Sequence, residues 1–287
     1  MRADFELIRL TWYDQMNRSS PCPWQRSRDS AGKAPEQSPP SLSLVSPCHR
    51  SAHGPDMRKR PIMRDAENKK DQMKELKHYS PLEEKLNITT HAAGLILSIA
   101  AFVLLITRAT TQGTIWHIAS FGIFGASLIL LYAASTFYHS AKNPASRTRL
   151  KIFDHASIYV LIAGTYTPFT LVTLNGPTGW VIFSISWGLA VTGIILKLFF
   201  TGQYHLISTI MYVLMGWVII FAIKPLIRSL PSEGLIWLFA GGISYTMGAV
   251  LYSIDKIKFN HAIFHIFVLT GSICHFISVC LYILPKK

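Results

Sequence analysis

Seven long apolar segments alternate with short polar connections along the last two thirds of the chain. Each segment is about 17–25 residues long, which is the length that an α-helix needs to cross a bilayer. No water is available there, so only helices satisfy the backbone polar groups of such a segment. The pattern predicts seven transmembrane helices, near residues 88–107, 115–138, 152–174, 179–200, 206–223, 234–254 and 262–284.

The first helix has a start signal in the sequence. Ser80 is a capping residue, Pro81 suits the first helical position, and Glu83 and Glu84 suit the first turn. We therefore expect an all-α membrane protein whose seven-transmembrane helix bundle covers residues 80–287. Because the connections are short, consecutive helices are expected to be antiparallel neighbours.

Residues 1–79 have a different composition. The stretch 19–55 is rich in Ser, Pro, Gly and Arg and shows no sustained period of a helix or strand. We expect a low-complexity, disordered cytoplasmic tail, without the apolar core and cleavage site of a secretory signal. The working protein is also expected to start later, at Met57, Met63 or Met73, and an intact mass that includes Met1 would refute this.

The composition argues against a soluble protein and sets the orientation. Only 15% of the 287 residues are charged, against roughly a quarter in ordinary globular chains. Residues 86–287 contain 12 basic side chains and only three carboxylates. With the N-terminus in the cytoplasm, 12 basic residues near the segment ends lie on the inner side and 5 on the outer side. This bias predicts a cytoplasmic N-terminus, the reverse of a G-protein-coupled receptor.

Several other classes of function are not supported. The net charge of +13 comes from basic residues that flank apolar segments, so we expect no nucleic-acid partner. The four cysteines form no Cys-x-x-Cys pair, which argues against a disulfide framework and a sulfur-ligated zinc site. The sequence contains no Gly-rich phosphate loop, no His-Glu-x-x-His and no nucleophile elbow.

Polar and ionisable side chains lie at a similar depth in four of the predicted helices. Burying such groups in lipid is costly, so they suggest a function. They lie at the starts of the first, third and seventh helices and at the end of the second, namely Asn87, His91, Asp154, His261, His265, Ser135 and His139. Because consecutive helices alternate in direction, these four helix ends lie at the same leaflet, whichever side is inside.

The spacing of these residues is typical of a metal site. Residues four apart share a helix face, so His261 and His265 can direct both rings at one point. Three neutral imidazoles suit zinc, and three protein ligands with one open position are typical of a catalytic site. We predict zinc ligands at His139, His261 and His265. Zinc lowers the pKa of its water to about 7; Asp154 would accept and return the proton, and Ser135 would steady the water or an oxyanion.

Simpler interpretations of the same residues remain open. A histidine pair at a membrane boundary, and His139 by itself, can be merely interfacial. Asp154 can cap the third helix or pair with Lys151. We expect Asn87 to form a hydrogen bond at a helix start or between helices. We expect His91 to support a metal ligand rather than bind the metal.

Residues 80–287 resemble the hemolysin III branch of the progestin and adipoQ receptor (PAQR) family. The resemblance rests on the ordered motifs Glu84-x-x-Asn87-x-x-x-His91, Ser135-x-x-x-His139, Asp154-His155-Ala156-Ser157-Ile158-Tyr159 continuing to Ala163-Gly164-Thr165-Tyr166-Thr167-Pro168-Phe169, Tyr212-x-x-Met215-Gly216-Trp217 and His261-x-x-x-His265-x-Phe267-Val268. It implies a seven-helix membrane protein with zinc at His139, His261 and His265. The wider superfamily includes alkaline ceramidases, so the resemblance also implies hydrolysis of a lipid amide.

Three functions follow as expectations. The first is a zinc-dependent hydrolase that acts on a membrane lipid, in an integral multi-pass protein of the plasma membrane. The second is a receptor or membrane sensor in which zinc is structural. The third is a hemolysin-type lytic or pore-forming protein. A pore needs a polar stripe through several helices, whereas the polar residues gather at one leaflet and Leu, Ile and Phe are expected in the outer halves.

Overall fold

The structure is a computed structural model that describes residues 79–200 and 205–284. The predicted tail lies outside these residues except for Tyr79, and so do the alternative starts. Within the described residues every regular element is a helix, which confirms the predicted all-α class.

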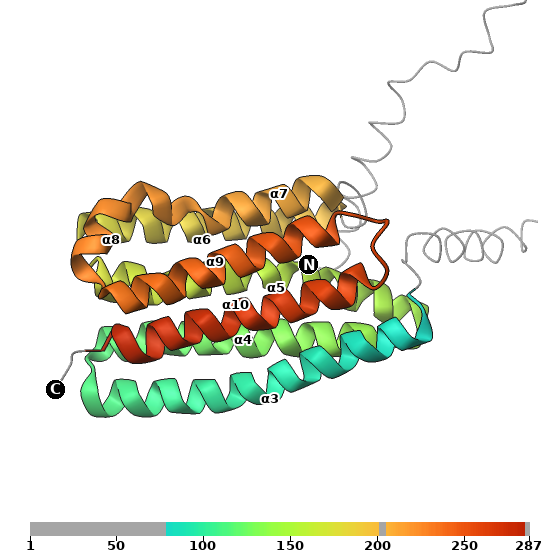
Figure 1. Cartoon of the computed structure of the whole chain (residues 1–287), viewed down its shortest axis with the longest axis horizontal. Helices are drawn as coiled ribbons and strands as arrows, with labels where there is room; N and C mark the ends of the chain where they lie inside the picture. Colours follow the sequence, from blue (N-terminus) through green and yellow to red (C-terminus); the bar gives the residue numbers. More distant parts are fainter. Residues whose placement is uncertain (1–78, 201–204, 285–287) are drawn as a thin grey trace, which may run out of the picture. The chain divides into compact units, whose positions relative to one another are not determined.

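Seven helical spans in the described part of the chain are long and apolar enough to cross a membrane. They are α3 (Pro81–Gln112), α4 (Ile115–Ser140), α5 (Pro144–Pro168) with η2 (Phe169–Thr173), α6 (Pro177–Phe200), α7 (His205–Gly216) with η3 (Val218–Ala222) and α8 (Ile223–Ser229), α9 (Ser232–Tyr252) and α10 (Asn260–Tyr282). Consecutive spans run side by side in alternating directions (Figure 1). The last helix, α10, packs against both α9 and α3, which brings the two ends of the bundle's sequence together.

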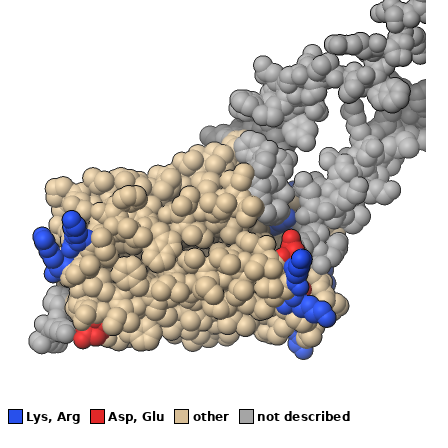
Figure 2. All heavy atoms as spheres, turned by 45° about the horizontal axis from the view of Figure 1, so that its top comes forward, with Lys and Arg blue, Asp and Glu red and all other residues tan. Residues whose placement is uncertain are grey.

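The outer surface of the bundle suits lipid. On the face shown in Figure 2, Lys, Arg, Asp and Glu lie at the two ends, and the band between them carries no charged side chain. Large apolar side chains stay exposed on this type of surface, among them Phe221 at 87%, Ile96 at 71% and Ile236 at 66%. Together, this apolar surface and the seven apolar spans indicate an integral multi-pass membrane protein.

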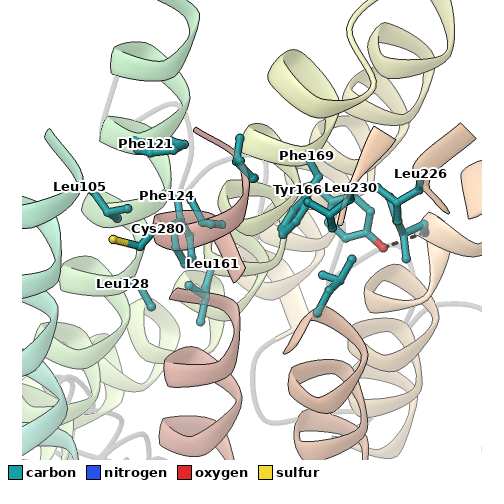
Figure 3. Close-up of a cluster of buried hydrophobic side chains, with 14 of the residues drawn as sticks. Leu105, Phe121, Phe124, Leu128, Leu161, Tyr166, Phe169, Leu226, Leu230 and Cys280 are labelled. Carbon is teal, nitrogen blue, oxygen red and sulfur yellow. Dashed lines mark hydrogen bonds between the residues drawn. The ribbon is translucent and has the colours of Figure 1, made fainter. Parts of the chain in front are cut away.

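A packed apolar core runs along the bundle from beside the predicted site into the opposite half. Leu105, Phe124 and Leu161 belong to it, and Figure 3 shows them with residues of α4, α5, α8 and α10. Polar side chains are also buried in this half, although Leu, Ile and Phe were expected there. Ser278 near the end of α10 donates to the Gly234 carbonyl over 2.8 Å, so such groups form hydrogen bonds within the bundle.

One predicted helix start agrees with the structure, and another lies too late in the sequence. The Ser80 hydroxyl accepts from the Glu83 amide over 3.2 Å and caps α3 as predicted. In contrast, α5 begins at Pro144, well before the predicted position 152. The Asn143 side chain caps α5 by accepting from the Ala145 amide over 3.0 Å. The first turns of α5 are polar, so hydropathy alone did not detect them.

The fifth span is interrupted in mid-membrane. Its α-helix ends at Gly216, a 3-10 segment follows, and the span continues to Ser229, beyond the predicted end at 223. The Tyr166 hydroxyl donates to the Gly216 carbonyl over 2.7 Å and accepts from the Ile219 amide over 2.9 Å. Backbone groups that lose their helical hydrogen bonds at the interruption therefore find a partner on α5. Such a partner is required for polar groups buried in a bilayer.

Candidate metal centre

Three histidines from two helices converge at one end of the bundle. The Nε2 atoms of His139 and His261 lie 3.1 Å apart, and so do those of His265 and His261. All three side chains are buried, and one ligand atom of each lies within 4.8 Å of the others. The structure thus brings together the three predicted ligands and positions them to bind a metal ion.

The donor set fits a metal such as zinc. Two nitrogens at ~2.0–2.1 Å from one tetrahedral zinc ion lie roughly 3.3–3.4 Å apart, close to the 3.1 Å between the histidine nitrogens. His139 Nδ1 lies 2.9 Å from Glu84 Oε2. Since an ionised carboxylate only accepts, this nitrogen carries the proton, and Nε2 keeps its lone pair. On the other side of the His265 ring, Nδ1 lies 3.5 Å from the Thr90 hydroxyl, with the Asn87 carbonyl also nearby.

The start of α10 is fixed by its link to α9. Asn260 donates from its side-chain amide to the Tyr252 carbonyl over 3.0 Å. The preceding residue, Phe259, has a φ of 59°, a left-handed conformation that is uncommon for a residue with a side chain. This sharp start places His261 within the first turn of α10 and His265 one turn later, so that both rings face α4.

Asp154 and Ser135 lie beside the histidines. Both are buried; the Asp154 carboxylate lies near the Ser135 hydroxyl and in the field of His139, and its Oδ2 lies 3.6 Å from His155 Nδ1. Ser135 Oγ makes no conventional hydrogen bond to any described residue. Because α5 starts at Pro144, Asp154 lies ~15 Å along the helix, at 1.5 Å per residue. Asp154 is therefore a buried carboxylate inside the span rather than a cap at its start.

One face of α3 supports two of the three histidines. Glu84 contacts His139, the Asn87 carbonyl faces His265, and His91 stacks on His265 with ring centroids 3.5 Å apart. The Asn87 side chain also donates to Glu84 Oε2 over 3.4 Å. Asn87 and His91 therefore contact the candidate ligands or their partners.

Aromatic rings cover the histidine cluster. The Tyr79 ring lies 4.8 Å from that of His261, and the Tyr252 ring lies 5.3 Å from it. Burial raises the pKa of the Tyr79 hydroxyl well above its usual value, so this group stays neutral. These rings pack against a cluster whose three histidines are buried.

A cavity of about 140 Å³ adjoins the histidines and extends along the bundle. Asp154, His261 and His265 line one part of it, and Trp217 and His275 line another. His275 lies ten residues beyond His265, which corresponds to ~15 Å along an α-helix. The surface of the cavity is largely apolar, with Leu131, Ile158 and Phe264 on its wall, although Lys197, Tyr212 and several hydroxyl side chains also line it. The cavity therefore connects the histidines with the middle of the bundle through a largely apolar space.

Two contributors were not predicted from the sequence as site residues. Glu84 was identified as a helix-start residue and within a motif, but not as the partner of His139. Its spacing of three and seven residues before Asn87 and His91 places all three on one helix face, and this is the signal that would have found it. Tyr79 gave no comparable signal, since it precedes the first helix.

The fold and the site define a class of protein: a seven-helix integral membrane protein with a buried histidine cluster at one end of the bundle. The family model "Haemolysin-III related" matches residues 79–276. The chain belongs to this family, which confirms the expected membership.

Its relatives agree with this assignment. The chain is 48% identical over 203 residues to Hemolysin-3 of Bacillus cereus, covering 71% of this chain and 93% of that protein. It is 48% identical over 200 residues to the Hemolysin-3 homolog of Bacillus subtilis (strain 168), covering 70% and 94%. The human monocyte to macrophage differentiation factor is 29% identical over 208 residues, covering 70% and 84%, in agreement with the wider PAQR family.

Proposed function

We propose that this protein is a zinc-dependent hydrolase of the plasma membrane that cleaves an amide bond in a membrane lipid. One observation carries the proposal: three imidazole nitrogens converge beside a buried carboxylate at the wall of an apolar cavity. When bound, zinc supplies Lewis acidity at this point and brings the pKa of water there close to 7. The donor set of three histidines supports zinc among the common metals.

The protein's own residues have separate roles in this proposal. Asp154 accepts a proton from the attacking water and returns it to the leaving amine, so that the amide bond gives a carboxylic acid and an amine. The Ser135 hydroxyl, which has no conventional hydrogen bond to a described residue, is available to donate to the developing oxyanion. Tyr79 and Tyr252 limit the entry of bulk water.

The cavity supports a lipid as the substrate. Its largely apolar wall favours an acyl chain, and the histidines lie at one end of the bundle, at the depth of a lipid headgroup. A scissile amide between the headgroup and the acyl chain would lie beside Asp154 when the chain fills the cavity.

The Asp154→Asn variant tests the proposal. It should retain its metal, because no predicted ligand changes, but lose turnover of ceramide-like lipids by a factor of about 10²–10⁴, which is the usual contribution of an acid–base residue. Metal content by mass spectrometry and release of fatty acid would be measured together. Asp255→Asn changes an exposed acid in the α9–α10 connection and serves as the control. Parental turnover by D154N would remove the assigned base, whereas a metal-loaded but inactive wild-type protein would favour the sensor function.

Lysis is a second candidate, because two relatives are named Hemolysin-3 or its homolog. A conducting pore needs a continuous polar path, and the long cavity has a largely apolar wall. Deeper polar groups such as Ser278, which donates to the Gly234 carbonyl over 2.8 Å, have partners within the bundle. Conductance of planar bilayers that contain the purified protein would reverse this ranking.

A further inference from the structure

The Glu84 carboxylate connects the histidine cluster to an arginine on a third helix. Oε2 accepts from His139 Nδ1 over 2.9 Å, and Oε1 accepts from the Arg147 guanidinium. We propose that Glu84 and Arg147 form a positioning pair that holds His139 in the orientation and tautomer needed to bind the metal. This inference rests on the proposed metal site but not on the proposed hydrolysis.

The carboxylate selects the useful tautomer of His139. A neutral imidazole carries its proton on one of two nitrogens, and only the other one can bind a metal. An ionised Glu84 accepts but cannot donate, so it favours the proton on Nδ1. Nε2 then keeps its lone pair and faces His261 Nε2 at 3.1 Å. An amide in place of the carboxylate could donate to Nδ1 and favour the tautomer that cannot bind the metal.

Arg147 keeps the carboxylate in place. The Glu84 side chain is 19% exposed, while that of His139 is fully buried, so Glu84 lies at the border between the site and its surroundings. Arg147 is itself held by other contacts: Nη1 donates to the Ala141 carbonyl over 3.4 Å, and the guanidinium lies 5.0 Å from the centre of the Tyr138 ring. The planar fork of a guanidinium holds a carboxylate in a defined direction.

The pair joins three helices at the site. Glu84 lies in the first turn of α3, His139 in the last turn of α4, and Arg147 in the first turn of α5. A tie that only stabilised the bundle would change its melting temperature and leave the metal affinity unchanged. A positioning pair instead changes the metal affinity, and partners of this kind typically change it by about 10–100-fold.

The experiment measures zinc affinity of the full-length purified protein in detergent, by competition with a chromogenic chelator. We expect Glu84→Gln to bind zinc about 10–100-fold more weakly than the wild type. Arg147→Gln should show part of this loss, and Arg147→Lys should recover some of it, since it keeps the charge but lacks the fork. The double variant E84Q/R147Q should bind no more weakly than E84Q alone, because Arg147 acts through Glu84.

Two matched controls separate positioning from local charge. Glu83→Gln removes the acid next to Glu84, and the Glu83 backbone amide that donates to Ser80 is kept. Arg149→Gln removes an exposed arginine of α5, the helix that carries Arg147. Both should bind zinc as the wild type does. In the cobalt-substituted protein, E84Q should also change the visible absorption spectrum, which reports the geometry of the ligands.

The outcomes distinguish this inference from the proposed function. Parental zinc affinity in E84Q, with zinc bound by the wild type, would overturn the positioning pair and leave the hydrolase proposal standing. Additive losses in the double variant would overturn the action of Arg147 through Glu84. Should E84Q fail to fold, the Arg147 variants and their controls still decide. A wild-type protein that binds no zinc would overturn the pair and the proposed metal site together.

Discussion

The imidazole rings of His91 and His265 lie stacked, with centroids 3.5 Å apart and planes inclined by 15°. His91 also meets the ring of Tyr132 edge-on at 5.1 Å. Neither nitrogen of His91 has a hydrogen-bond partner among the described residues. A ring stacked on a candidate ligand restricts that ligand's plane, so we expect His91 to act on a bound metal through packing.

We predict that His91→Phe keeps most of the metal affinity and His91→Ala loses more of it. Phenylalanine retains a flat ring against His265 at a modest cost in packing, about 1–3 kcal/mol, whereas alanine leaves a cavity. Zinc content and melting temperature of both variants would be measured. If His91 were a fourth ligand, the two variants would lose zinc equally.

Removal of a predicted ligand should abolish tight metal binding. His261→Ala takes away the nitrogen that lies 3.1 Å from both other Nε2 atoms, so two imidazoles remain, too few for a stable zinc site. We expect metal content near zero after dialysis against a weak chelator. His117→Asn, at the start of α4 near the opposite end of the bundle, should keep its metal. Full zinc content in H261A would contradict the predicted ligand set.

The sequence was sufficient to predict that the three histidines meet. The i, i+4 spacing of His261 and His265, together with alternating helix directions, placed them at the leaflet of His139. The partner of His139 was harder to predict, because an acid such as Glu84 in the first turn of a helix is already explained by the helix start. Which side-chain atom faces which depends on the rotation of α3 about its axis, and this is set by packing across helices rather than by spacing along one.

Hydropathy predicted the seven spans but not their interruptions. Residues 206–223 read as one continuous span because apolar side chains continue through Gly216 and Trp217. The interruption depends on Tyr166 of α5, whose hydroxyl bonds to backbone on both sides of it. Such a tertiary partner leaves no periodic signal in the segment that it stabilises.

We therefore expect Tyr166→Phe to destabilise the bundle. The variant would leave the Ile219 amide and the Gly216 carbonyl without this partner inside the bundle, at a cost of roughly 1–3 kcal/mol per buried group. Melting in detergent would measure the loss, and zinc content should stay unchanged. Tyr282→Phe alters a hydroxyl for which no hydrogen bond is described, at the end of α10, and should melt like the wild type. Equal melting of both variants would contradict the role of Tyr166.

Filling the cavity should change which lipids the protein accepts. Gly242 lines the cavity, and a Cβ added there would lie 3.8 Å from the Trp217 side chain, an ordinary contact. Gly242→Leu should therefore fold and retain its metal, yet reduce turnover of long-chain amides more than that of short-chain amides. Gly188→Leu adds the same side chain on the exposed face of α6, with nothing within 4 Å of its Cβ. Both replacements gain similar helix propensity, about 1 kcal/mol, so this pair isolates the cavity. Chain-length preference would be measured on a series of amides with one headgroup, and an identical preference in the two variants would place the acyl chain elsewhere.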